Sequence, residues 1–368
     1  MDKRKRRIFI VNDKAYGGGA EAVMRDIVKY LHQKYEITVM TLDDDYASFG
    51  KVFPENVKYI PAKIKHNTYS RINPLHYAVS IYNRLRIAYI RRGKYDIVIS
   101  NKEGPCMKLV SKMHAEKKFA WVHVDYQYLY WTRWTFEAAE EVKCMQQFDN
   151  VVCVSEATMN SVKKVIGDPG NLCVRYNPID YSTIKANAKE KNEVQRDELK
   201  PLFVAVGQIS EQKNFLTLVK VCSRLSKEYD FELWIVGDGE QRAEVEKILK
   251  KENCPCVKIM GMQSNPHKYL EKADFLVSTS LGESYGLVIQ EALVLGVPVL
   301  TTRCPAIEEC FDTRFGIFMD CKESSIEKGI RYVLEHQECI AEYKRVIEAE
   351  YDKNVLWEQR LQKIEDLF

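Results

Sequence analysis

The sequence predicts an α/β protein made of two doubly wound parallel sheets, each flanked by helices. Short apolar runs of four or five residues alternate with stretches of helical periodicity along the chain. This is the pattern of buried parallel strands joined by helices. The alternation stops in a polar segment near residue 190 and then restarts, which indicates a second domain. The chain is 368 residues long, enough for about two domains.

The first domain is predicted over residues 1–184. A glycine-rich loop follows its first strand and leads into a helix over residues 20–32. A second helix over residues 74–92 has a proline in its first turn and a glycine just after it, both usual at helix ends. The strands are expected at residues 8–11, 37–40, 96–100, 119–123 and 151–154.

Residues 185–200 are rich in Lys, Glu and Asn and are predicted to be a linker. The second domain is expected over residues 201–353. Its strands are predicted at residues 202–206, 232–236, 257–260, 275–278 and 297–301, and its helices at 216–228, 241–251 and 288–295. Residues 354–368 form an amphipathic pattern, and we expect this last helix to pack back on the first domain.

Composition narrows the class of protein. Hydrophobic residues make up 46% and charged residues 29%, as in ordinary soluble domains. No apolar run approaches the roughly 18 residues that span a bilayer, and the basic start lacks the apolar stretch of a secretory signal. The eleven cysteines show no zinc-ligand spacing and no CxxC pair. We therefore expect a cytoplasmic protein with reduced thiols.

Charge is distributed unevenly along the chain. Residues 1–180 carry 29 Lys and Arg against 20 Asp and Glu, and residues 51–100 alone carry ten bases and two acids. A solvated charged face would explain this, but so would an anionic partner such as a membrane surface or a phosphorylated acceptor. Nucleic acid is not expected, because the basic residues form no recognisable binding module.

The glycine-rich loop before the first helix suits an anion. Glycines there let a ligand approach the backbone and leave N–H groups unpaired at the helix start. Gly17, Gly19 and Ala22 also fit the G-x-G-x-x-A pattern, and Asp43 lies about where a dinucleotide enzyme places its ribose-binding acid. Against that alternative, the loop begins five residues after the strand, whereas the dinucleotide turn follows its strand almost directly. A plain loop and helix cap is the third interpretation.

The strongest pattern is a pair of glutamates, Glu283 and Glu291, eight residues apart around Tyr285, Gly286 and Leu287. Eight residues is just over two helical turns, so a helix that began early would place both carboxylates on one face. The N–H groups between them would form a phosphate site at the helix N-terminus. Carboxylates beside a phosphate site suit sugar hydroxyls, which donate hydrogen bonds to them.

Two further positions lie where strands end. Lys213 follows the strand at residues 202–206 after a short loop and can meet a pyrophosphate as a point charge. His123 ends the strand at residues 119–123, which is the edge where open α/β sheets bind ligands. The ordinary alternatives are a solvated surface lysine for Lys213 and a structural role for His123. The turn at residues 237–239 is expected to be only a tight turn.

Together these residues resemble the retaining glycosyltransferases of family 4, which have the two-domain GT-B fold. The resemblance covers nearly the whole chain in order, and the segment from Glu283 to Glu291 is its specific part. It rests on Gly18-Gly19-Ala20-Glu21, His123, and residues 154–156, 177–180, 207–213, 237–239 and 283–291.

The resemblance implies two Rossmann-like domains that face each other across a cleft, with a nucleotide-sugar donor in the second and an acceptor toward the first. Glu291 would hold the ribose hydroxyls and Glu283 those of the transferred sugar. The departing diphosphate would be stabilised by Lys213 and the N–H groups of residues 285–287, without a metal. The other implied contacts to the donor are Gly18, Gly19, Gln208 and Ser284, with His123 beside the sugar.

One position departs from the family pattern. Gln208 stands where the family usually has an Arg, so one positive charge toward the diphosphate is missing. Another base would have to substitute, or donor affinity would be lower.

We therefore expect a cytoplasmic retaining glycosyltransferase that uses a UDP-sugar, needs no metal, and acts in bacterial surface-polysaccharide assembly. The acceptor is expected to be a glycan or a polyprenyl-linked molecule. The enzyme is expected to be peripheral on the inner face of the plasma membrane. A dinucleotide-dependent oxidoreductase, a GT-B nucleotide-sugar epimerase and a non-catalytic sugar-binding relative remain as alternatives.

Overall fold

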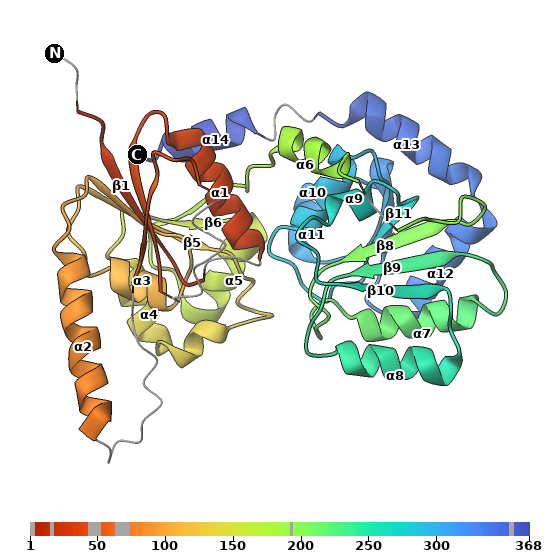
Figure 1. Cartoon of the computed structure of the whole chain (residues 1–368), viewed down its shortest axis with the longest axis horizontal. Helices are drawn as coiled ribbons and strands as arrows, with labels where there is room; N and C mark the ends of the chain where they lie inside the picture. Colours follow the sequence, from red (N-terminus) through yellow and green to blue (C-terminus); the bar gives the residue numbers. More distant parts are fainter. Residues whose placement is uncertain (1–3, 15–17, 43–52, 63–73, 192–193, 353–356) are drawn as a thin grey trace. The chain divides into compact units, whose positions relative to one another are not determined.

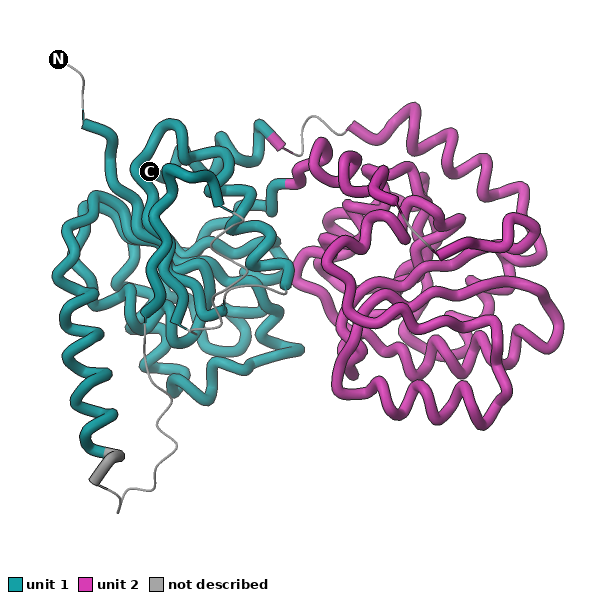
Figure 2. The backbone as a smooth tube through the Cα atoms, in the orientation of Figure 1, with its two compact units in different colours: residues 1–178, 358–368 teal, residues 179–357 magenta. Residues whose placement is uncertain are grey.

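The computed structural model describes residues 4–14, 18–42, 53–62, 74–191, 194–352 and 357–368. The chain divides into two compact units (Figure 2). Unit 1 comprises Met1–Pro178 and Glu358–Phe368, and unit 2 comprises Ile179–Trp357. Within the described residues, no helix is both long and apolar enough to cross a membrane.

Unit 1 contains a seven-stranded sheet in the order β3-β2-β1-β4-β5-β6-β7, and every pairing is parallel. The central strands are apolar on both faces, as parallel strands covered by helices must be. The strands are β1 (Arg7–Asn12), β2 (Glu36–Thr41), β3 (Lys58–Pro61), β4 (Ile97–Ser100), β5 (Lys117–Val122), β6 (Asn150–Cys153) and β7 (Leu172–Val174). The helices are α1 (Gly19–Leu31), α2 (Pro74–Arg91), α3 (Pro105–Val110), α4 (Ala138–Met145), α5 (Glu156–Ile166) and α14 (Glu358–Glu365), with a 3-10 turn at Trp131–Trp134.

Unit 2 contains a six-stranded parallel sheet in the order β10-β9-β8-β11-β12-β13 (Figure 1). Its strands are β8 (Leu202–Val206), β9 (Glu232–Val236), β10 (Val257–Gly261), β11 (Phe275–Ser278), β12 (Val299–Thr302) and β13 (Gly316–Met319). Its helices are α6 (Tyr181–Ala188), α7 (Phe215–Leu225), α8 (Arg242–Glu252), α9 (His267–Leu270), α10 (Leu287–Val294), α11 (Pro305–Cys310), α12 (Glu323–Glu335) and α13 (Glu338–Glu350).

Alternate residues of each strand in unit 2 enter two separate cores. Phe203 and Ala205 of β8 pack with α7, α8 and α12 on one face. Leu202 and Val204 pack with α9, α10 and α11 on the other. Helices therefore cover both faces, and the predicted doubly wound α/β class is confirmed. In each unit the strand order reverses beside the first strand, between β1 and β4 and between β8 and β11, which is where such sheets bind ligands.

The polar segment around residue 190 belongs to unit 2. Asp180 caps α6, because its carboxylate accepts a hydrogen bond from the Thr183 N–H at 3.0 Å. Farther along, the Arg196 guanidinium pairs with Asp274 at 2.9 Å. The division between the units thus falls at residue 179, ahead of residues 185–200.

The last helix, α14, packs on unit 1. Leu361 and Ile364 are buried there, and the Arg360 guanidinium donates to the Asn177 carbonyl at 2.7 Å. The ring of Phe368 lies 5.4 Å from that of Phe119 in β5. The chain therefore leaves unit 1, forms all of unit 2, and returns to complete unit 1.

Candidate functional site

Lys213 and Glu283 meet at the carboxyl edge of the unit 2 sheet. Lys213 lies between β8 and α7, and Glu283 lies between β11 and α10, two neighbouring strands. The Lys213 ammonium is 2.5 Å from Oε1 of Glu283, and both side chains are largely buried. The Ser280 hydroxyl donates to the same carboxylate oxygen at 2.7 Å. Two residues singled out from the sequence are thus one charged pair.

Further hydrogen bonds join the two loops that carry this pair. The Thr279 hydroxyl donates to the Lys213 carbonyl at 2.8 Å. The Gln212 amide donates to the Gly282 carbonyl, also at 2.8 Å. The ammonium and the carboxylate are therefore held in place by backbone contacts as well as by their charges.

Helix α10 begins at Leu287, just after a glycine with left-handed backbone. Gly286 has φ 76° and ψ 50°, and no side chain caps the helix. A Cβ at this position would lie 2.4 Å from Cδ1 of Ile307, so both the backbone and the packing favour glycine. The buried Tyr285 precedes it, and its carbonyl accepts from the Cys310 thiol at 3.1 Å. The N–H groups at the start of a helix without a side-chain cap are favourable for an anion.

The predicted geometry of the two glutamates is wrong in one respect. Because α10 starts at Leu287, Glu283 lies in the preceding loop and only Glu291 is on the helix. The two carboxylates therefore do not share a helical face. Ser284 lies in the same loop as Glu283.

Glu291 lies beside a histidine that the sequence analysis did not select. Its Oε2 is 3.5 Å from Nε2 of His267, the first residue of α9. The side chain of His267 is 13% exposed and that of Glu291 is 23% exposed. The Nε2 atom of His267 has no hydrogen-bond partner among the described residues. A buried polar atom beside a partly buried carboxylate can receive a ligand hydroxyl.

The loops after β8 and β9, the first of which carries Gln208, pack closely against each other. A Cβ on Gly237 would lie 1.8 Å from the Gly207 carbonyl oxygen, and one on Gly239 would lie 2.4 Å from that of Ile209. Glycine is therefore required by close backbone approach at both sites. The exposed Gln208 amide donates to Glu240 Oε2 at 3.0 Å. Gln208 thus brings no positive charge and its amide is already paired with a carboxylate.

In unit 1, the start of α1 presents glycine backbone. Gly18 precedes the helix, Gly19 is its first residue, and no side chain caps it. A Cβ on Gly18 would lie 2.6 Å from Oε2 of the buried Glu21. Gly17 and Asp43, on which the dinucleotide alternative rests, lie outside the described residues.

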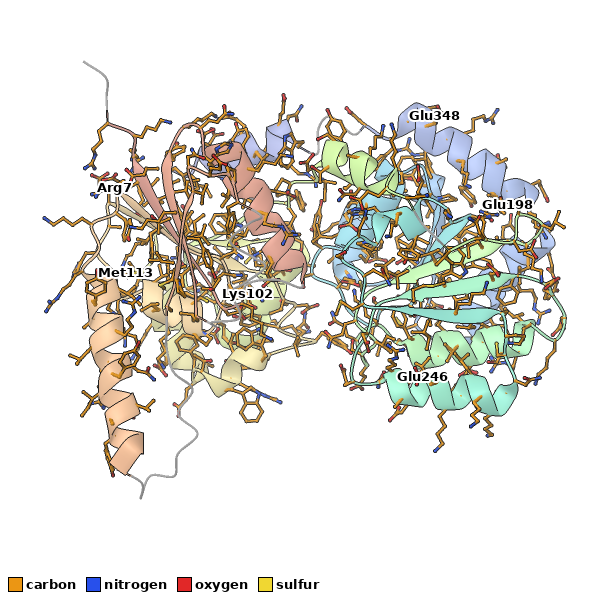
Figure 3. All side chains as sticks on the ribbon, in the orientation of Figure 1. Arg7, Lys102, Met113, Glu198, Glu246 and Glu348 are labelled. Carbon is orange, nitrogen blue, oxygen red and sulfur yellow. The ribbon has the colours of Figure 1, made fainter. Side chains whose placement is uncertain are left out.

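A largely buried lysine holds this loop in place. Lys102, labelled in Figure 3, follows β4 and places its ammonium 2.7 Å from Glu21 and 3.0 Å from Asp13. Burial opposes the charged form, but the two carboxylates overcome it and raise the pKa of Lys102. The Asn101 amide also donates to the Ala20 carbonyl at 3.2 Å. The polar residues directly after β4 thus position the glycine loop.

His123 lies just past β5 and is held by a buried carboxylate. The backbone N–H of His123 donates to Glu103 Oε2 at 3.0 Å, and the Trp131 indole donates to Oε1 of the same carboxylate at 2.9 Å. Burial raises the pKa of Glu103. Burial and the nearby Lys102 charge lower the pKa of His123 to about 3. The imidazole is therefore neutral near pH 7, and its Nε2 has no partner among the described residues.

Lys102, Glu103 and His267 are the site residues that sequence reasoning missed. Asn101, Lys102 and Glu103 come directly after the strand predicted at residues 96–100, and this position was a usable signal. His267 carried none, because its contact to Glu291 joins separate elements. Among the described residues, no group of three or more His, Cys, Asp and Glu is arranged to hold a metal ion.

Two family models match the chain. The model described as Glycosyl transferases group 1 matches residues 186–353, and the model described as Glycosyltransferase Family 4 matches residues 17–183. The chain belongs to glycosyltransferase family 4. The resemblance seen in the sequence is thereby confirmed.

Curated relatives of this family-4 chain match it over part of their length. One is the N-acetylgalactosamine-N,N'-diacetylbacillosaminyl-diphospho-undecaprenol 4-alpha-N-acetylgalactosaminyltransferase of Campylobacter jejuni, 30% identical, with 46% of each chain covered. Another is the N-acetyl-alpha-D-glucosaminyl L-malate synthase of Bacillus anthracis, 26% identical, with 45% of this chain and 44% of the relative covered. The matches span less than half the length of these relatives.

Solved structures match the family-4 chain almost completely. The Anabaena protein HepE, in complex with UDP and glucose, superposes with a TM-score of 0.76 at 15% identity, covering 98% of this chain and all of HepE. Sucrose-phosphate synthase from Thermosynechococcus elongatus gives a TM-score of 0.76 at 16% identity, covering 99% and 98% of the chains. The fold is GT-B, as expected from the resemblance.

The neutral state of His123 makes the stability of the protein depend on pH. The folded protein disfavours the imidazolium, whereas the unfolded chain takes up this proton below the ordinary pKa of 6.5. The stabilising contribution is therefore complete above pH 6.5 and is lost as the pH falls toward 3. We expect this group to lower the free energy of unfolding by about 2 kcal/mol between pH 7 and pH 5. The His123→Asn variant should not show this decrease.

Urea unfolding at the two pH values measures this loss. His114→Asn, at an exposed histidine of the same unit, is the matched control and should keep the wild-type slope. Equal pH dependence in wild type and His123→Asn would contradict the assignment.

Proposed function

We propose that this chain is a retaining glycosyltransferase that takes a sugar from a UDP-sugar. The observation that supports this most strongly is the Lys213–Glu283 pair beside the uncapped start of α10. A cation and helix N–H groups suit the diphosphate that departs in such a reaction, and a carboxylate suits sugar hydroxyls.

The proposed chemistry is electrostatic. As the bond between the sugar and the diphosphate breaks, negative charge grows on the phosphate oxygens. Preorganised donors such as the Lys213 ammonium and the N–H groups of residues 285–287 stabilise that charge without first reorganising. Glu283 then keeps Oε2 for the transferred sugar, because Ser280 and Lys213 both contact Oε1. Glu291 and His267 are assigned to the ribose hydroxyls.

Gly18, Gly19 and His123 of unit 1 are the remaining residues that the family resemblance assigns to the donor. The N–H groups of Gly18 and Gly19 offer hydrogen bonds to an anionic oxygen. His123 is neutral, so it serves as a hydrogen-bond partner for a hydroxyl rather than as a cationic acid. A retaining transfer on the face of departure requires no side-chain nucleophile, and we assign none.

The acceptor is proposed to be a glycan or a polyprenyl-linked molecule, as in bacterial surface-polysaccharide assembly. The protein is proposed to be peripheral on the cytoplasmic face of an anionic membrane. The name of the Campylobacter relative includes a diphospho-undecaprenol acceptor, which supports a lipid-linked class. The excess of bases in residues 51–100 supports an anionic surface. Residues 51–52 and 63–73 of that segment lie outside the described residues.

A thermal-shift panel with EDTA present tests the donor site. UDP, GDP, ADP, CMP and NAD are each added to wild type, Glu291→Ala and the surface control Glu246→Ala. At about 100 times its dissociation constant, a ligand of the native state adds about 2.7 kcal/mol and raises Tm by about 5–10 °C. We expect this shift with UDP, its loss in Glu291→Ala, and its retention in Glu246→Ala.

Other results of the panel would point elsewhere. A shift with NAD alone would overturn the proposal in favour of the dinucleotide alternative. A shift with another nucleoside diphosphate would keep the transferase and correct the base. A UDP shift that requires omission of EDTA would show a metal requirement.

Gln208→Arg tests the missing cation. An arginine there adds a full positive charge beside the proposed diphosphate site, so we expect UDP affinity to rise about 3–10-fold at low salt and less at raised salt. Isothermal titration measures both. Gln337→Arg adds the same charge at an exposed position before α13 and should leave the affinity unchanged. An equal gain in both variants would mean a general charge effect rather than a local contact.

A further inference from the structure

Helix α2 of unit 1 exposes a continuous apolar face. Ile81, Leu85 and Tyr89 are 56%, 67% and 69% exposed. They follow one another at four-residue intervals, so they project from the same side of the helix. We call these three residues the α2 outer face. Figure 1 shows α2 as a long helix with its first turns extending beyond the other elements of unit 1.

The opposite side of α2 anchors it to unit 1. Ile90 is buried in the unit 1 core, and Ile87 packs against that core. The Arg86 guanidinium donates to the carbonyls of Ala62 at 2.9 Å and Pro61 at 3.3 Å. The helix is therefore held in one orientation, and the α2 outer face points away from the core.

The charged residues of α2 itself are all basic. The helix PLHYAVSIYNRLRIAYIR contains no Asp or Glu. Arg84 is exposed beside Ile81 and Leu85, and Arg92 is exposed one residue past the end of the helix. A helix with one apolar face and only basic charges is the type that lies in the interface of an anionic bilayer.

We propose that the α2 outer face is the surface by which this protein contacts an anionic lipid bilayer. Ile81, Leu85 and Tyr89 enter the interface between headgroups and acyl chains, while Arg84 and Arg92 reach the lipid phosphates. A second copy of the chain is a poorer occupant, because it would bring two helices of the same charge together. The inference rests on the proposed function in one point only: a lipid-linked acceptor gives the protein a reason to bind a membrane.

Sedimentation with vesicles tests the inference on the whole chain. Vesicles of phosphatidylcholine with or without phosphatidylglycerol are used at low and raised salt. The double variant Ile81→Ser with Leu85→Ser removes apolar surface without changing charge. Leu199→Ser is its matched control, because Leu199 of unit 2 is 93% exposed. Arg84→Gln with Arg92→Gln tests the electrostatic part, and the UDP thermal shift reports the donor site separately.

The wild type should bind phosphatidylglycerol vesicles and release them as salt rises. The serine double variant should bind about tenfold more weakly, Leu199→Ser should bind as wild type, and the arginine variant should lose most of the salt dependence. All should keep the wild-type response to UDP.

Four results would overturn the inference. The first two are wild-type protein that binds neither kind of vesicle, and wild-type protein that binds both equally at every salt concentration. The third is a serine variant that binds as well as wild type, which would assign membrane association to another surface. The fourth is a serine variant that is a monomer without vesicles where the wild type is an oligomer, which would make this face a contact between copies. Loss of the UDP response in wild type would reject the proposed donor without bearing on α2.

Discussion

The contact between Lys213 and Glu283 sets the charge balance at the carboxyl edge of the unit 2 sheet. Both side chains are largely buried and 2.5 Å apart, so removing either one would leave the other without its partner in a buried place. The strand ends bring them together, because β8 and β11 are neighbours in the sheet although 70 residues separate the pair. The Lys213 ammonium has three N–H donors, so in the proposed site it contacts Glu283 Oε1 and a diphosphate oxygen together, while Oε2 remains for the sugar. On the proposed function, phosphate binding and sugar binding are coupled through this one contact.

Unit 1 uses the same arrangement for a different purpose. Lys102 is enclosed by Asp13 and Glu21, so its charge is satisfied within the protein and fixes the loop that presents Gly18. Its second effect is on His123, because the lysine charge and burial together keep the imidazole neutral. Glu103 completes the arrangement by accepting from the His123 backbone and the Trp131 indole. Lys102 thus positions a loop, and its charge adds to the effect of burial in lowering the pKa of the neighbouring histidine.

The sequence was sufficient for elements whose residues are buried on both faces. The runs at residues 8–11 and 202–206 correspond to β1 and β8, because a fully covered strand needs an unbroken apolar run. The short strands β3, β7 and β13 were missed, since they are only three or four residues long and partly exposed. The prediction that Glu283 and Glu291 share a helical face was wrong, because the helix begins only after the left-handed Gly286. His267 gains its role from a partner in another element, which no local pattern indicates, whereas Glu103 was marked only by its position after a predicted strand.

The titration of UDP into wild type, Lys213→Ala and Glu283→Gln tests the coupling most directly. UDP has no transferred sugar, so removing the Glu283 charge should leave its affinity unchanged or raise it, because one negative charge near the diphosphate is gone. Lys213→Ala should weaken UDP binding about 10–100-fold, as expected for a lost charged hydrogen bond. If Glu283→Gln weakens UDP binding as much as Lys213→Ala does, while both variants remain folded at the temperature of the titration, the carboxylate binds the nucleotide part itself and the proposed division of roles is wrong.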